Sequence, residues 1–81
     1  MRKASGKLRK FVISNIKFYR EKYGYSQEEL SLAIGRKKGF IEKLENNEYK
    51  AEPRIDTVSA IADALNISVN WLLLGEKDER K

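Results

Sequence analysis

The chain has 81 residues, 17 of them Lys or Arg and 12 Asp or Glu, a net charge of +5, and neither cysteine nor histidine. This length suits one small domain around a single core. Without cysteine there is no disulfide or thiolate metal site, and without histidine the commonest general base is missing. No apolar run reaches membrane-spanning length. We therefore expect a cytoplasmic protein with no membrane partner, catalytic residue, cofactor or metal.

Positive charge is concentrated in the first part of the chain. Residues 1–50 carry 13 basic and 6 acidic side chains, a net charge of +7, whereas residues 51–81 carry 4 and 6, a net charge of −2. Such an excess is typical of a nucleic-acid-binding surface, although a solvated surface that keeps the protein soluble gives the same count. Residues 1–10 hold five basic side chains and no acidic one. We expect a flexible basic arm there, which either contacts DNA or is a solubilising tail.

A first helix is predicted to begin near Leu8–Phe11 and to end at Gly24. Arg20 lies at the edge of its apolar face. Four residues recur at the helical period and should form the buried stripe of this helix: Val12, Ile16, Tyr19 and Tyr23.

Two short helices joined by a tight turn are predicted between Ser26 and Asn46. Ser26 followed three residues later by Glu29 is a capping box, which marks the start of the first of these helices. Gly35 supplies a left-handed residue that ends it. Helices this short need neighbouring elements to cover their apolar faces. The residues expected on those faces are Leu30, Ala33, Ile34, Ile41 and Leu44.

Two more helices should follow a polar loop that ends at Pro53. The first is expected from about Arg54 to Leu65, with Asn66 in the left-handed conformation that ends it. The last helix, residues 69–74, should begin at the cap residue Ser68 and end at Gly75. Trp71 should fill a place in the core. The residues expected to be buried on the longer of the two helices are Ile55, Val58, Ile61, Ala62 and Leu65.

No stretch of the sequence alternates as a strand does, so the predicted fold class is all-α, with five helices in one domain. We place this domain at residues 11–75, between the basic arm at residues 1–10 and a charged tail at residues 76–81.

The two short helices closely resemble the helix-turn-helix of the lambdoid phage repressor and Cro family of transcriptional regulators, the XRE family. The small side chain of Ser31 lets the second helix cross close to it, and Gly35 suits the turn. The resemblance extends over residues 13–75, and it implies a lambda-repressor-like fold. It also implies an ion pair between Arg20 and Glu45. The matching positions are Gln27, Leu30, Ser31, Ile34, Gly35, Ile41, Leu44, Glu45 and Asn46.

The resemblance further implies which residues contact double-stranded DNA. In the family, the second helix of the motif, the recognition helix, enters the major groove. The expected base-reading residues are Lys37, Lys38, Gly39 and Lys43. Lysine suits the O6 and N7 acceptors of guanine, although for Lys37 a contact with phosphate is equally open. The expected phosphate contacts are Gln27, Arg36, Asn46 and Arg54.

Two residues depart from the family pattern at the start of the recognition helix. Lys37 stands where the family usually has a capping Ser or Thr, and Gly39 costs the helix about 1 kcal/mol relative to alanine. We therefore expect this helix start to be loose in the free protein and to become ordered on DNA. Phe40 should pack against the following loop, with a thymine methyl contact as the alternative.

These features predict a sequence-specific DNA-binding transcriptional regulator, a repressor that binds a palindromic operator as a homodimer. We expect it to be nucleoid-associated and of prokaryotic or phage origin. The candidate dimer face is Val69, Leu72 and Leu73, with core packing as the alternative use of some of these residues. An antitoxin with a toxin partner, or a protein-interaction module with the same fold, are the alternatives. An enzyme is disfavoured because the carboxylates are scattered and no phosphate-binding glycine loop is present.

Overall fold

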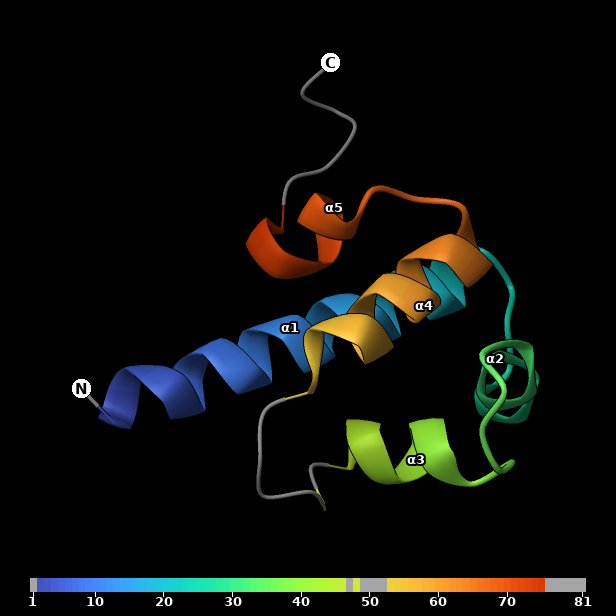
Figure 1. Ribbon diagram of the computed structural model, residues 1–81, viewed down its shortest axis with the longest axis horizontal. Coiled ribbons are helices and arrows are strands. Elements are labelled where there is room, and N and C mark those ends of the chain that lie inside the picture. Colours follow the sequence, from blue (N-terminus) through green and yellow to red (C-terminus); the bar gives the residue numbers. More distant parts are fainter. Residues whose placement is uncertain (1, 47, 49–52, 76–81) are drawn as a thin grey trace.

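The computed structural model of the protein describes residues 2–46, 48 and 53–75, with side chains from residue 9 onward. These ranges contain five helices and no strand, which confirms the predicted all-α fold. Figure 1 shows α1 and α4 together through the middle of the molecule, α5 on one side of them and α3 on the other. The helices are α1 (Arg2–Lys22), α2 (Gln27–Ala33), α3 (Phe40–Glu45), α4 (Ile55–Leu65) and α5 (Val69–Leu74).

The start of α1 differs from the prediction. The helix begins at Arg2, not near Leu8–Phe11. The preceding residues are mostly Lys, Arg, Ala and Leu, which favour helix, and Gly6 alone is unfavourable there. A helix already nucleated by its packed part therefore extends through them. The side chains of residues 1–8 and all of residues 76–81 lie outside the described ones, so the arm and the tail stay predictions.

Three helix ends follow the local signals in the sequence. Gly24 and Gly35 have φ angles of 80° and 78°, and Asn66 has 60°, as a left-handed helix end requires. After Gly35, the Arg36 N–H donates to the Ser31 carbonyl oxygen at 2.9 Å, so the chain turns sharply out of α2. This bond closes the end of α2 and directs the chain toward α3.

One hydrophobic core joins all five helices. Three residues expected to be covered are exposed: Tyr23 (41%) follows the end of α1, Ala33 is the last residue of α2, and Ile55 (63%) is the first residue of α4. At a helix end the apolar period of the sequence continues, but no neighbouring element covers the side chain. In α4 the buried residue near this end is Thr57. Trp71 is partly buried, and its ring stacks 5.6 Å from that of Tyr19. The core contains Val12, Ile13, Ile16, Tyr19, Leu30, Ile41, Leu44, Val58, Ile61, Ala62, Leu65 and Leu72.

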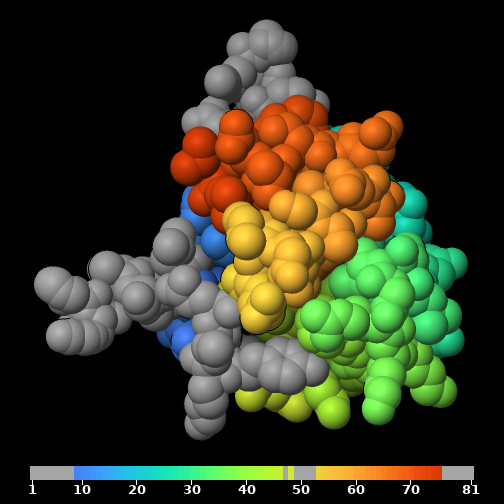
Figure 2. All heavy atoms as spheres, in the orientation of Figure 1, coloured from blue at the N-terminus to red at the C-terminus, as the bar shows by residue number. Residues whose placement is uncertain are grey.

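The helices that carry the predicted motif lie against α4 on one face of the molecule. Figure 2 shows the α2–α3 region in green directly beside α4 in orange, and α2 and α4 are in contact. The α2–α3 pair is therefore supported on its inner side by α1 and α4.

Within the described ranges, every helix is too short or too polar to span a bilayer.

Candidate nucleic-acid interface

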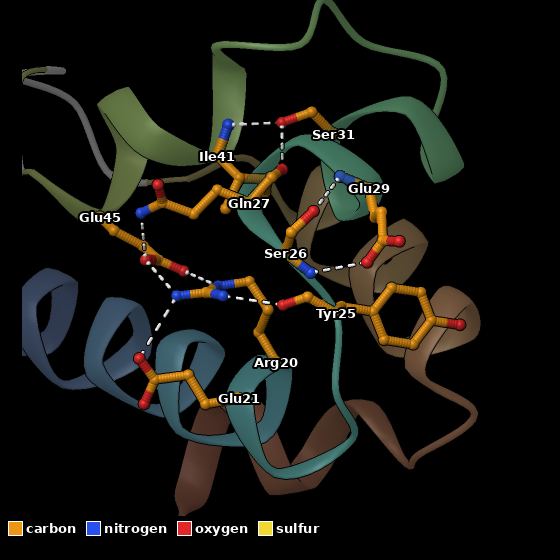
Figure 3. Close-up of polar contacts among 9 residues, drawn as sticks. All are labelled: Arg20, Glu21, Tyr25, Ser26, Gln27, Glu29, Ser31, Ile41 and Glu45. Carbon is orange, nitrogen blue, oxygen red and sulfur yellow. Dashed lines mark hydrogen bonds and ion pairs between the residues drawn. The ribbon is translucent and has the colours of Figure 1, made fainter.

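A buried ion pair joins the end of α1 to the end of α3. The Arg20 Nε donates to Glu45 Oε2 at 2.7 Å, and the Arg20 Nη2 donates to Glu45 Oε1 at 3.0 Å (Figure 3). The exposed fractions of these side chains are only 9% and 3%. The third Arg20 nitrogen donates to the Tyr25 carbonyl oxygen at 2.8 Å. This is the pair that the family resemblance implied, and its two-point geometry fixes the angle between the two helices.

The start of α2 is bound to the same carboxylate. Gln27, expected to contact phosphate, donates from its Nε2 to Glu45 Oε1 at 2.8 Å. The predicted capping box is present: Ser26 Oγ accepts the Glu29 N–H, and Glu29 Oε1 accepts the Ser26 N–H. Three helices therefore meet at Glu45 (Figure 3). The sequence showed no signal for the Gln27 contact, because it depends on how α2 crosses α3.

The start of α3 is held from α2. Gly39 is the N-cap residue, and α3 has no side-chain cap from its own chain segment. Instead, the Ile41 N–H donates to Ser31 Oγ at 2.9 Å, and Ser31 Oγ donates to the Gln27 carbonyl oxygen at 2.8 Å. The hydroxyl of a neighbouring helix thus accepts an N–H that the missing cap would have bound, and the loose helix start in the free protein stays a prediction. Sequence reasoning took Ser31 only as a small residue.

A surface groove of about 530 Å³ lies over the turn and the outer face of α3. It has no acidic lining residue among those described. The Arg36 guanidinium stacks over the Phe40 ring, 4.3 Å from its centroid, and Arg36 Nη2 donates to Thr57 Oγ1 at 3.3 Å. Phe40 is partly buried against the core, and most of the following loop lies outside the described residues. The groove is lined by Gly35, Arg36, Lys37, Gly39, Phe40 and Lys43.

The groove brings together four of the predicted DNA contacts and leaves the others outside its lining. Lys43 is exposed on α3, opposite the buried Ile41 and Leu44, whereas Lys37 precedes the helix. Lys38 is exposed in the turn and Asn46 is the C-cap residue of α3. Every cation expected to read bases or bind phosphate near α3 is therefore solvent-accessible.

Arg54 lies apart, at the start of α4. It is the N-cap residue there, and its Nε donates to Asp56 Oδ1 at 3.3 Å. This hydrogen bond lowers the pKa of the fully exposed Asp56 carboxyl below its ordinary value. Arg54 is therefore already engaged by a carboxylate, in contrast to the cations of the groove.

Two cations lie at the other end of α3: Lys10, from the predicted basic arm, and Lys17, which the sequence analysis did not select. A second groove, of about 290 Å³, is lined by Lys10, Ile13, Ser14, Lys17 and Glu45. Lys10 and Lys17 are exposed on α1 and are seven residues apart, two helical turns. The signal in the sequence was this spacing, which becomes informative only once α3 is known to pack on α1.

The candidate dimer face needs one correction. Leu72 is completely buried, so it belongs to the core and is not a free surface residue. Val69 and Leu73 are partly buried against the core. Leu74, which was not selected, is 61% exposed at the end of α5. Because α5 packs on both α1 and α4, the core takes Leu72 from the candidate dimer face.

Two short helices joined by a sharp turn, with a locked inner face and a basic outer face, define a helix-turn-helix domain. A family model described as "Helix-turn-helix" matches residues 16–72. The chain belongs to this family, the XRE-type helix-turn-helix transcriptional regulators. Over 64 residues it is 38% identical to the HTH-type transcriptional regulator SinR of Bacillus licheniformis; the match covers 79% of this chain and 56% of the relative, about half its length.

A solved structure is similar over most of the chain. The crystal structure of the hypothetical transcription factor NHTF from Neisseria superposes with a TM-score of 0.75 at 27% sequence identity. The match covers 90% of this chain and 80% of that one. The fold and the family agree with the resemblance that the motif residues indicated.

Proposed function

We propose that the chain is a sequence-specific DNA-binding regulator that places α3 in the major groove and acts as a repressor by occupying an operator. The observation that carries this proposal is the contrast between the two sides of α3. Its inner residues Ile41 and Leu44 are buried, and its outer side adjoins a basic groove without an acidic lining residue. A rigid helix with exposed cations suits major-groove entry, with phosphates on either side.

The electrostatics support contacts with phosphates at both ends of α3. Arg36 and Lys37 lie before its first residue, and Lys10 and Lys17 lie on α1 beside its last residue. Arg36 on one side and Lys10 and Lys17 on the other would contact the DNA backbone, while Lys43 between them would face base edges. Lys37 can contact either a phosphate or a base. We further propose that two copies bind a palindrome, because one short helix makes few base contacts.

The experiment is selection of bound fragments from a pool of random double-stranded DNA, followed by affinity measurements at two salt concentrations. We expect enrichment of a two-fold symmetric sequence with G·C pairs in each half-site, and affinity that falls as salt rises. Affinity for mixed DNA that is negligible even at low salt would contradict the proposal. That result would instead favour a protein-interaction module or an antitoxin that works through its partner.

A further inference from the structure

We propose that Ser31 is a positioning residue for the recognition helix: its hydroxyl, which belongs to α2, fixes the N-terminal end of α3. The proposal deepens the proposed function, and its consequence for DNA reading rests on that function. The alternative is a purely steric role, in which Ser31 is small only so that the two helices can cross closely. In that case alanine would serve equally well.

The Ser31 hydroxyl has a defined orientation. The residue is fully buried, with an exposed fraction of 0%. Its hydrogen is donated to the Gln27 carbonyl oxygen at 2.8 Å, and its oxygen accepts the Ile41 N–H at 2.9 Å (Figure 3). A hydroxyl whose proton is already committed presents its lone pairs in a fixed direction. It therefore acts as a rigid bridge from the backbone of α2 to the backbone of α3.

The bridge acts where α3 cannot satisfy its own backbone. The Phe40 N–H donates to the Lys37 carbonyl oxygen at 3.0 Å, a tight turn of the 3₁₀ type. In a regular α-helix that carbonyl would accept the Ile41 N–H, four residues on. Ile41 is fully buried, so water is not available to its N–H. Ser31 supplies the acceptor that neither Lys37 nor Gly39 provides.

The two ends of α3 are then held by the same segment of α2. Gln27 accepts the Ser31 hydroxyl through its carbonyl and donates its side-chain amide to Glu45. A helix of six residues has little stability of its own, so its orientation depends on such contacts. Loss of the Ser31 bridge frees the end that leads toward the bases, while Glu45 keeps the other end in place.

The first test is amide hydrogen exchange of Ile41 in the free protein, with Ser31→Ala compared with Ser26→Ala. Ser26 is the matched control because its Oγ also accepts a helix-start N–H at 2.9 Å, but in α2. Exchange at Ile61, in the core of α4, corrects for global opening. After this correction we expect Ser31→Ala to accelerate Ile41 exchange by about 2- to 30-fold, the range for a lost cap, and Ser26→Ala to leave it unchanged.

Equal Ile41 exchange in the two variants would overturn the proposal. If Ser31→Ala does not fold, the parent protein decides alone: an Ile41 amide without protection in the parent would overturn the proposal as well. Neither measurement involves DNA, so both remain valid if the proposed function fails.

The second test addresses the positioning role. We expect the ratio of affinity for the selected operator to affinity for mixed DNA to fall several-fold in Ser31→Ala and to be unchanged in Ser26→Ala. A residue that only stabilises the fold would lower both affinities by the same factor, and that outcome would contradict the positioning role. A parent that binds no DNA would refute the proposed function and leave the exchange result standing.

Discussion

Arg20 and Glu45 are joined by two hydrogen bonds, of 2.7 and 3.0 Å, although they are 25 residues apart in the sequence. Both side chains are almost completely buried, so Glu45→Ala leaves the Arg20 guanidinium with only a longer contact, 3.5 Å from its Nη2 to Oε2 of the exposed Glu21. We predict that Glu45→Ala lowers the free energy of unfolding by about 3–5 kcal/mol. Chemical denaturation of the variant and the parent measures this difference.

The matched control for this prediction is Glu42→Ala. Glu42 is a glutamate of the same helix with an exposed side chain, so its loss should change stability by less than about 0.5 kcal/mol. A Glu45→Ala midpoint equal to that of Glu42→Ala would show that the pair does not stabilise the fold.

Lys43 and Arg36 should affect DNA binding in different ways. Lys43 lies on the outer side of α3, so Lys43→Ala should remove a base contact and relax the preference at one position of each half-site, by about 1–3 kcal/mol. Arg36 lies in the turn, stacked on Phe40, and its loss should weaken all sequences alike. The salt slope should then fall by about 1 per subunit. Lys37→Ala can follow either pattern.

The measurement for this prediction uses the operator and its single-base variants at two salt concentrations. If Lys43→Ala weakens every variant equally, Lys43 contacts phosphate and the base-reading residue is to be sought at Lys38. If Arg36→Ala changes the order of preference among the variants, then Arg36 reads sequence and is not a phosphate contact.

Lys17 should contribute to DNA affinity although it lies outside the helix-turn-helix. It lines the groove between α1 and the end of α3. Lys22, a lysine of the same helix, lies instead about 6 Å from the rings of Phe18 and Tyr23. We predict that Lys17→Ala lowers affinity for all sequences and reduces the salt slope by about 1, and that Lys22→Ala does neither. Equal effects of the two substitutions in a binding titration would argue against a contact at Lys17.

Leu72 and Leu74 separate folding from self-association. Leu72 is fully buried, so Leu72→Ala should destabilise by about 2–5 kcal/mol. Leu74 is 61% exposed, so Leu74→Glu should keep the parent stability but weaken pairing of two copies on DNA. In the parent, binding should rise more steeply than first order in protein concentration. Sedimentation of the parent complex with one copy per operator would rule out the dimer.

The local parts of the structure were predictable from the sequence, and the parts that depend on helix crossing were not. Gly35 and Asn66 end their helices as expected, because a left-handed residue ends a helix wherever it lies in a fold. Tyr23 and Ile55 were misplaced because periodicity describes one helix and says nothing of what covers its ends. The family resemblance selected four residues that line the basic groove, Arg36, Lys37, Gly39 and Lys43, and four others that lie outside its lining.

Ser31 shows which information the sequence alone lacks, namely how closely two helices cross. Its bond to the Ile41 N–H joins residues ten positions apart on different helices, and it forms only at one crossing distance. Sequence reasoning compared Lys37 with a capping residue and concluded that a cap was missing, because it considered caps only within the same segment.

The meeting of three helices at Glu45 also restricts how this chain can vary. Arg20, Gln27 and Ser31 each depend on the same placement of α3, so the effect of changing one should depend on which residues occupy the other positions. We expect replacement of Glu45 by an apolar residue to be tolerated best together with replacement of Arg20, since either change alone leaves a buried charge without its main partner. The outer residues of α3 take no part in this coupling. On the proposed function, we therefore expect substitutions at Lys43 to change operator preference independently, while the interior behind it changes only in concert.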